Sequence, residues 1–295
     1  PPGPGASAPD TGREPARALD AQAMRQDFIK MHGLGNDFVV LDGRERPLPG
    51  MDARLAAALA NRRTGIGCDQ LIVLEPSTAA DFRMRIFNCD GSEAEACGNA
   101  SRAVGLLHGK PATIETLGGL LRAEPADLGI AVELPAPRLE WQQIPLAYAM
   151  DTLTMPVGWD GPDGPVAVNV GNPHAVFFVP DAGAVALDRI GPEIEHDPLF
   201  PERVNVNVAQ VLSPDAIRLR VWERGAGETR ACGTGACATA IAAMRRGLTA
   251  RRVTVCQPGG DLVIAWREDG TILMTGPATE SFRGSFDPAD YGVRA

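Results

Sequence analysis

The chain has 295 residues, 44% of them hydrophobic, with 28 Lys and Arg against 37 Asp and Glu and a formal charge of −9. This length suffices for two domains, while the acidic balance and the lack of a Lys/Arg-rich run argue against a nucleic-acid-binding protein. No apolar run has the roughly eighteen residues of a membrane span, and the six cysteines form no CxxC pair and are too few for a disulfide scaffold.

We therefore expect a soluble, cytoplasmic protein with reduced thiols that binds neither nucleic acid nor a membrane. Residues 1–23 lack aromatic side chains and are rich in Pro, Gly and Ala. Such a segment buries too little apolar surface to offset its ordering entropy, which predicts a disordered leader or tag at residues 1–25, with Met24 as a natural start. A second Pro/Gly-rich stretch, Met155–Pro165, is typical of a connector or surface loop.

The sequence on either side of this connector is duplicated. Phe82–Ala103 aligns without a gap on Ile217–Ala238 at an offset of 135, and seven positions are identical. Ordinary residue usage would give roughly one or two matches in such a window. Gln70 falls on Asn205 at the same offset, and Gly35-Asn36 falls on Gly171-Asn172 at an offset of 136. Two similar domains related by an approximate twofold axis are the leading structural hypothesis.

Each half shows the same predicted elements in the same order. FRMRIFN and IRLRVWE alternate apolar residues with Arg, which indicates half-buried strands. An Ala-rich stretch then follows a Cys-Gly pair and predicts a helix that ends near Gly109 or Gly247. The helix Cys232–Met244 is almost entirely apolar and should be buried. Hairpin strands come next in both halves, with Gly-Gly and Asp-Gly at their turns.

These elements predict an α+β fold with two similar domains, each a mainly antiparallel sheet wrapped around a central helix. The domain bounds that we expect are 26–140 for the first, with 279–295 returning to it, and 141–278 for the second.

Cys97 and Cys232 occupy equivalent positions at the starts of the two central helices. The free amides and the dipole of a helix N-terminus stabilise a thiolate and lower its pKa, and they also form an anion site suited to a carboxylate. Across a twofold axis the two thiols would face one cleft. That arrangement suits inversion at carbon, in which one group removes a proton and its counterpart delivers one to the other face.

A cysteine in an Ala-rich helix is more often a small buried hydrophobe, and this is our interpretation of Cys237 and Cys256. Cys68 and Cys89 have no partner at a metal-ligand spacing, and we also expect them to be inert. The duplicated context and the flanking small residues separate Cys97 and Cys232 from these four.

Six motifs in this sequence resemble those of the diaminopimelate epimerase family. They are KMHGLGNDFVVLD, GIGCDQ, NCDGSEAEACGNASR, GNPH, FPERVNV and ERGAGETRACGTGA, and they run in the family's order from Lys30 to Ala236. The resemblance implies an isomerase, without any cofactor or metal, that interconverts LL-diaminopimelate and meso-diaminopimelate for lysine and peptidoglycan precursor synthesis. As partners we expect a small amino-acid substrate and a second copy in a homodimer.

The resemblance also implies residue roles. It makes Cys97 and Cys232 the acid/base thiols, and His174 and Glu223 residues that tune them. It implies a larger set of substrate-binding residues: Asn36, Gln70, Asn88, Gly98, Asn99, Asn172, Asn205, Glu223, Arg224, Gly233 and Thr234.

Each of these assignments has a plainer alternative. Asn36 and Asn172 follow glycines and could be turn residues, and Glu223-Arg224 could be a solvated pair at a strand end. His174 could be a structural histidine that donates to the backbone.

Three other functions stay open. A two-thiol proline or hydroxyproline racemase of similar fold would need fewer polar groups for a distal amino-acid end. A redox or metal-binding protein would have only two ligands in this cysteine pair, and a non-catalytic amino-acid-binding protein would have no use for both thiols.

Overall fold

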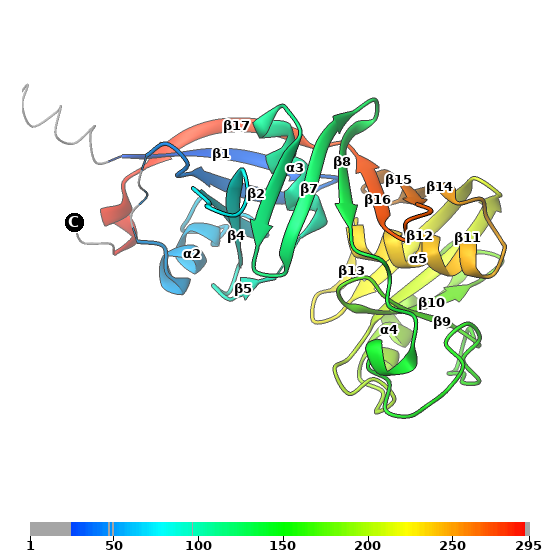
Figure 1. Cartoon of the computed structure of the whole chain (residues 1–295). Helices are drawn as coiled ribbons and strands as arrows, with labels where there is room; N and C mark the ends of the chain where they lie inside the picture. The colour runs from blue at the N-terminus through cyan, green and yellow to red at the C-terminus, as the bar shows by residue number, and fades with distance from the viewer. Residues whose placement is uncertain (1–24, 47, 49, 96, 293–295) are drawn as a thin grey trace, which may run out of the picture.

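The computed structural model describes residues 25–46, 48, 50–95 and 97–292. The leader predicted at residues 1–25 lies outside the described residues except for Arg25. Figure 1 shows two lobes side by side, which we call the first half and the second half. In the first half the elements are β1 (Gln26–Gly33), β2 (Asn36–Asp42), α2 (Ala53–Ala60), β3 (Gln70–Glu75), β4 (Phe82–Asn88), β5 (Glu93–Ala94), α3 (Gly98–His108), β6 (Ala112–Thr116), β7 (Gly119–Ala126) and β8 (Gly129–Leu134).

The second half repeats this pattern with additional short elements. It comprises η1 (Trp141–Gln143), β9 (Val166–Asn169), β10 (Pro173–Phe178), η2 (Ala182–Ala184), α4 (Leu187–Glu195), β11 (Asn205–Ser213), β12 (Ala216–Glu223), β13 (Gly227–Thr229), α5 (Gly233–Arg245), β14 (Arg252–Gln257), β15 (Gly260–Trp266) and β16 (Ile272–Gly276). The chain ends with β17 (Thr279–Phe286) and η3 (Pro288–Tyr291).

The strand pairing confirms the duplication. In the first half, β1–β2 is antiparallel, β2–β3 parallel, β3–β4 antiparallel and β4–β6 parallel, and both β6–β7 and β7–β8 are antiparallel. In the second half, the pairs β9–β10, β10–β11, β11–β12, β12–β14, β14–β15 and β15–β16 have the same orientations in the same order. The short strands β5 and β13 also pair antiparallel with β4 and β12. The α+β class and the two similar mainly antiparallel units are therefore confirmed.

The two halves join through an antiparallel pair between their last strands, β8 and β16. Gly129 corresponds to Gly270 at an offset of 141, so Val132 corresponds to Leu273 and Glu133 to Met274. The observed pairs are Val132 with Met274 and Glu133 with Leu273. Exchange of the two halves turns each of these pairs into the other, as an approximate twofold axis through the β8–β16 ladder requires.

A central helix begins directly after each cysteine. Helix α3 ends at His108, where Gly109 takes a left-handed conformation with φ 75° and closes the last turn. Helix α5 ends at Arg245, and Gly247 is left-handed two residues later with φ 66°. Nearly every residue of α5 is buried, because the sheet of the second half encloses it. The predicted helices and their glycine ends are confirmed.

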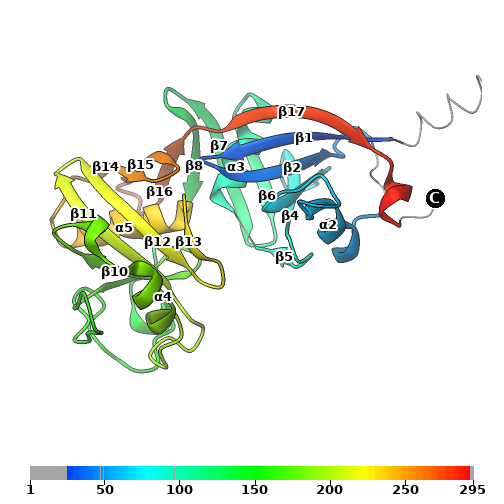
Figure 2. The ribbon, with the colours of Figure 1, turned by 180° about the vertical axis from the view of Figure 1, so that it is seen from behind.

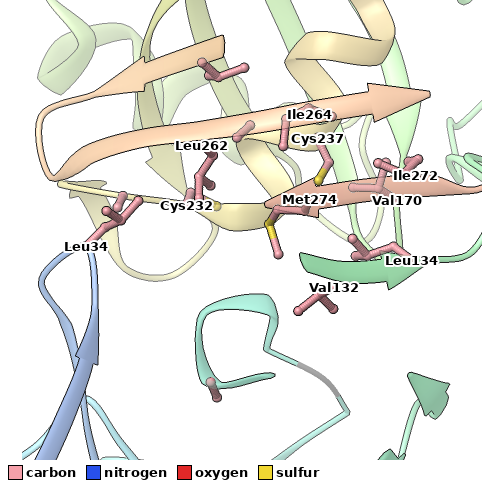
Figure 3. Close-up of a cluster of buried hydrophobic side chains, with 14 of the residues drawn as sticks. Leu34, Val132, Leu134, Val170, Cys232, Cys237, Leu262, Ile264, Ile272 and Met274 are labelled. Atoms are coloured by element: carbon pink, nitrogen blue, oxygen red, sulfur yellow. The ribbon is translucent and has the colours of Figure 1, made fainter. Parts of the chain in front are cut away.

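A single apolar cluster runs across both halves. Figure 3 shows Val132 and Leu134 from β8 beside Ile272 and Met274 from β16, with Cys237 of α5 close by. Leu34, at the β1–β2 turn, belongs to the same cluster. Two smaller clusters lie under α4 in the second half and around α2 in the first. The shared cluster fixes the helix starts of the two halves against one another.

The chain crosses between the halves twice, after β8 and after β16. The connector predicted at Met155–Pro165 lies after the first crossing. It packs on the second half, because Met155 is fully buried and Arg246 donates to the Gly164 carbonyl at 2.6 Å. After the second crossing, β17 pairs with β1 along its length (Figures 1 and 2). The domain bounds stay a prediction, which this return of β17 supports.

Candidate active site

In the first half, polar side chains gather at one edge of the sheet. Strands β2 and β3 are parallel, with Phe38 opposite Gln70, and β4 is antiparallel to β3, with Gln70 opposite Asn88. The start of β2, the start of β3 and the end of β4 therefore meet at the same edge, and they carry Asn36, Gln70 and Asn88. Gln70 Nε2 donates to Asn88 Oδ1 at 3.0 Å.

The second half presents the same edge again. Asn172 directly precedes β10, Asn205 begins β11 and Glu223 ends β12. His174 lies opposite Asn205 in the parallel β10–β11 pair, as Phe38 lies opposite Gln70 in the first half. The duplication thus places two matching sets of polar side chains at two matching sheet edges.

Each central helix has a cysteine as its N-cap residue. Cys97 and Cys232 have extended backbone dihedrals and directly precede α3 and α5. Cys97 Sγ accepts a hydrogen bond from the Ala100 amide at 3.4 Å, and Cys232 Sγ accepts one from the Gly235 amide at 3.3 Å. Both sulfur atoms therefore occupy the position where a capping oxygen usually lies and where the helix dipole favours negative charge.

The two helix starts lie close together, beside the side chain of the same methionine. A β-carbon on Gly98 would come within 2.6 Å of Met274 Cε, and one on Gly233 within 3.2 Å of Met274 Sδ. Because these glycines directly follow Cys97 and Cys232, the contact with Met274 brings the two cysteine-capped termini to one place.

A single cleft of about 1220 Å³ lies between the halves and takes its lining from both. Nearly all of the predicted site residues line it, namely Asn36, Gln70, Asn88, Cys97, Gly98, Asn99, Asn172, Glu223, Arg224, Cys232, Gly233 and Thr234. Asn205 and His174 do not line the cleft. Asn205 is buried behind it, where its Oδ1 accepts from the Arg224 amide at 2.9 Å and its Nδ2 donates to the Pro173 carbonyl at 2.9 Å.

Burial dominates the ionisation of both thiols. It raises the pKa of Cys97, although the amides of Ala100 and Asn99 and the charge of Arg102 oppose the shift. It raises the pKa of Cys232 well above its usual value, and the Glu223 carboxylate raises it further. The capping amides oppose this shift, but burial outweighs them, so the lowered thiol pKa expected from the sequence is wrong. A thiolate formed here is a strong base, as removal of a weakly acidic proton from carbon requires.

Glu223 is the carboxylate that acts on both thiols, because its negative charge raises the pKa of Cys97 as well as that of Cys232. Thr229 Oγ1 donates to Glu223 Oε1 and holds the carboxylate in place. These contacts agree with a thiol-tuning role for Glu223, which stays a prediction.

His174 is fully buried and contacts two asparagines. Burial lowers its pKa to about 4, so the ring is neutral at neutral pH. Asn207 Nδ2 donates to the Gly235 carbonyl and to Thr239 Oγ1, both at 2.9 Å, which leaves its Oδ1 facing His174 Nδ1 at 3.1 Å. The proton of the ring therefore resides on Nδ1.

The other ring nitrogen, Nε2, can then only accept a hydrogen bond. Asn172 Oδ1 lies 2.9 Å from Nε2, and rotation of this amide by half a turn brings its nitrogen to face the ring and satisfies the contact. In the structure, His174 thus orients Asn172 at the wall of the cleft. Its thiol-tuning role stays a prediction.

Asp69, Arg102 and Asn207 are among the residues of this site that were not singled out from the sequence. Asp69 accepts hydrogen bonds from Asn36 and from the Asp37 amide at 3.0 and 3.1 Å. Arg102 is fully buried beneath Asn99. Asp69 and Arg102 lie within the motifs GIGCDQ and NCDGSEAEACGNASR, and Asn207 lies directly after FPERVNV. Their position next to predicted site residues was therefore the signal by which the sequence could have identified them.

Neither a metal cluster nor a membrane helix is seen in the ranges that the structure describes. No group of three or more His, Cys, Asp or Glu side chains within 25–46, 48, 50–95 and 97–292 is arranged to hold a metal ion. In the same ranges no helix is long and apolar enough to cross a membrane.

Comparison with known proteins gives consistent relationships. The diaminopimelate epimerase family model matches residues 28–135 and 166–280. A diaminopimelate epimerase of Erythrobacter litoralis is 66% identical over 268 residues, which cover 91% of this chain and 100% of the relative. One of Sphingopyxis alaskensis is 62% identical, with 91% of this chain and 100% of the relative covered.

Solved structures of similar fold are more distant in sequence. A PhzF-family phenazine biosynthesis protein of Enterococcus faecalis has a TM-score of 0.67 at 17% identity, with 89% of this chain and 99% of that chain covered. A hydroxyproline epimerase of Agrobacterium vitis has a TM-score of 0.63 at 15% identity, with 91% and 95% covered. At these identities the likeness concerns the fold alone. The family match and the close relatives go further, and they show that the chain belongs to the diaminopimelate epimerase family.

Proposed function

We propose that this chain interconverts LL-diaminopimelate and meso-diaminopimelate by a two-thiol proton transfer at the α-carbon, without a cofactor. The observation that carries the proposal is the pair of cysteine-capped helix termini in one cleft, whose next residues, Gly98 and Gly233, contact the same Met274 side chain. The proposal is further supported by relatives at 66% and 62% identity that are diaminopimelate epimerases.

The reaction requires one cysteine as thiolate and the other as thiol. The thiolate removes the α-proton, so that a carbon–hydrogen bond breaks, a sulfur–hydrogen bond forms, and the electron pair delocalises into the α-carboxylate. The second thiol then delivers its proton to the opposite face of the carbon and is left as thiolate. Reversal starts from this second thiolate, and the matched capping of Cys97 and Cys232 supports use in both directions.

The α-carboxylate of the substrate would bind between the two helix N-termini. The amides of Gly98 and Asn99 begin α3, and those of Gly233 and Thr234 begin α5. Free amides and the positive ends of two helix dipoles suit a carboxylate, and they also stabilise the negative charge that develops on it when the α-proton leaves.

The distal amino-acid end of the substrate needs donors, acceptors and charge of both signs. Glu223 and Arg224 line the cleft with Asn36, Asn88 and Asn172. The Arg224 guanidinium donates to the Glu202 carbonyl at 2.7 Å, which fixes its side chain at the rim. A site for proline would need fewer polar groups than this, because proline has no distal amino-acid end, and this observation disfavours the proline racemase alternative.

The remaining expectations are also part of this proposal. We also infer a homodimer and a cytoplasmic location. Both are predictions from the sequence. We likewise infer domains at 26–140 with 279–295 and at 141–278, supported by the pairing of β17 with β1.

The test is epimerisation of LL-diaminopimelate in deuterated water with no pyridoxal phosphate added. The product should carry deuterium at the inverted carbon, and a Cys97→Ala or Cys232→Ala variant should lose turnover by at least about a thousandfold. A requirement for pyridoxal phosphate, faster turnover of proline than of diaminopimelate, or full activity in either variant would each refute the proposal.

A further inference from the structure

Arg102 of α3 is the largest fully buried side chain among the described residues. Its guanidinium donates to Asn99 Oδ1 at 2.8 Å and to the Pro277 carbonyl at 3.3 Å, and it contacts Met274 Sδ at 3.5 Å. In the part of the chain that the structure describes, none of its hydrogen bonds is to a carboxylate. A buried cation without a carboxylate costs several kcal/mol, which indicates that Arg102 is kept for a purpose other than stability.

Arg102 fixes the orientation of the Asn99 amide. A guanidinium can only donate hydrogen bonds, so the Asn99 atom that faces it must be the oxygen. The Asn99 nitrogen then faces the cleft, where it donates to Asn36 Oδ1 at 3.1 Å.

Asp69 fixes the next amide from the opposite side. A carboxylate can only accept hydrogen bonds, so the Asn36 atom that faces Asp69 Oδ2 at 3.0 Å must be the nitrogen. Asp69 is itself held by the Arg62 guanidinium at 2.8 Å and by the Asp37 amide at 3.1 Å. A buried cation at one end and a fixed anion at the other thus leave one orientation for both asparagines.

The result is that an oxygen faces Cys97. Asn36 Oδ1 lies 3.9 Å from Cys97 Sγ and can accept a hydrogen bond from its thiol but not donate one to its thiolate. We propose that Arg102 and Asp69 are positioning residues that lock Asn99 and Asn36 from opposite ends, so that Asn36 presents a hydrogen-bond acceptor to Cys97 and favours its thiol form against the opposing charge of Arg102.

Only Cys97 has this pair of positioning residues. At the offset of 135 that relates the halves, Arg102 corresponds to Cys237 and Asp69 to Val204. Neither a cation nor a carboxylate therefore stands at these positions beside Cys232. The charged groups that act on Cys97 are Arg102 from its own helix and Glu223 from β12, and Glu223 acts on Cys232 as well. A substitution that shifts the ionisation of Cys97 but not that of Cys232 would therefore indicate an effect of the Arg102–Asp69 pair.

This inference rests on the proposed acid/base use of Cys97, but its test needs no turnover. The full chain without substrate is treated with iodoacetamide over a range of pH, and alkylation of Cys97 and Cys232 is followed by mass spectrometry. Thiolates react and thiols do not, so the midpoint of each profile reports ionisation.

Asp69→Asn should lower the Cys97 midpoint by about half a pH unit or more, because Asn36 is then no longer held at its nitrogen. It can give up its bond from Asn99 and turn that nitrogen toward the sulfur, where it stabilises the thiolate. Arg102→Met should raise it by a similar amount, because the thiolate loses the nearby cation that lowers the pKa of Cys97, and this loss outweighs the release of the Asn99 amide. Arg102→Lys retains the charge and the donor, and it should give a smaller rise. The Cys232 midpoint should stay within about a quarter of a pH unit in all three.

Asp37→Asn is the matched control, because Asp37 is a carboxylate of the same network that contacts Arg62 and Lys30 but not the Asn36 side chain. Its effect on Cys97 should be smaller than that of Asp69→Asn. An unchanged Cys97 midpoint in Asp69→Asn and Arg102→Met, equal shifts of both thiols, or an equal effect of Asp37→Asn would overturn the proposal. Loss of epimerisation with these midpoints as expected would instead concern the proposed function.

Discussion

Gly259 lies directly against the backbone of Leu34, so that a β-carbon at position 259 would come within 2.2 Å of the Leu34 carbonyl oxygen. Leu34 forms the β1–β2 turn of the first half with a left-handed φ of 57°, and Gly259 precedes β15 in the second half. The two turns therefore meet backbone to backbone beside Cys232, where Figure 3 shows Leu34 next to the strands of the second half.

Gly259→Ala should destabilise the protein, because the clash involves backbone atoms that cannot move aside. We expect a loss of about 3 kcal/mol in the free energy of unfolding, measured by urea denaturation. Gly118→Ala is the matched control at the equivalent turn of the first half. There the nearest atom, the Glu95 carbonyl oxygen, would lie 3.1 Å from the new β-carbon, and about 1 kcal/mol or less should be lost. Equal losses in the two variants would contradict this interpretation of the interface.

The sequence predicted the fold to the level of strands, helices and their duplication. FRMRIFN and IRLRVWE became β4 and β12, and both helices begin at the glycine after each cysteine. These features follow from local periodicity and turn residues, which a sequence displays directly. The β8–β16 ladder could not be predicted in the same way, since pairing between distant strands depends on how the two halves pack.

The site was predicted less completely, and the missing part has a physical cause. Residues at strand ends and helix caps, such as Asn36 and Cys97, are marked by glycines and small residues beside them. Arg102 and Asn207 act from behind the cleft, Arg102 by facing the Asn99 amide oxygen and Asn207 by turning its own amide oxygen toward the His174 ring. Hydrogen-bond direction in three dimensions has no periodicity in sequence. Burial, which raises the pKa of Cys97 and Cys232, is likewise a property of packing.

Glu223→Gln should make both thiols more acidic. Burial is the main cause of their raised pKa values, but the Glu223 carboxylate raises both further, and its neutral replacement removes that contribution. In a Cys97→Ala background, the thiolate absorbance of Cys232 should appear at a pH lower by about one unit. Glu228→Gln is the control, because Glu228 lines the same cleft but pairs with Arg220 at 2.8 Å. A titration unchanged by Glu223→Gln would exclude this residue from thiol tuning.

Asp37→Asn should lower stability at neutral pH and have less effect in acid. Burial would raise the pKa of Asp37, but hydrogen bonds from Arg62 and Lys30 outweigh it and hold the pKa well below its usual value. A carboxyl group with a lowered pKa stabilises the fold above its unfolded pKa near 4, and this contribution is lost as the pH falls through the folded value. The variant should therefore be about 1–2 kcal/mol less stable than the parent at about pH 7.

The difference between Asp37→Asn and the parent should shrink steadily below about pH 4, as urea denaturation at a series of pH values would measure. Asp127→Asn serves as control, since Asp127 is exposed in the β7–β8 turn and its loss should not alter stability. A difference between Asp37→Asn and the parent that stays constant down to about pH 2 would show that the carboxylate contributes through something other than its ionisation.

Mild oxidation should link Cys97 to Cys232 and inactivate the protein reversibly. Both thiols line one cleft, and the glycine after each contacts the same Met274 side chain, so a small closure of the halves would bring the sulfur atoms into bonding range. Cys237 is fully buried in α5 and does not line the cleft, so it should take no part in this link. Peptide mapping should find the Cys97–Cys232 disulfide in the inactive protein, and thiol reduction should restore activity.

A Cys97→Ala variant should form no internal link under the same oxidant. Inactive protein whose disulfides lie elsewhere would mean that the two thiols do not face one another.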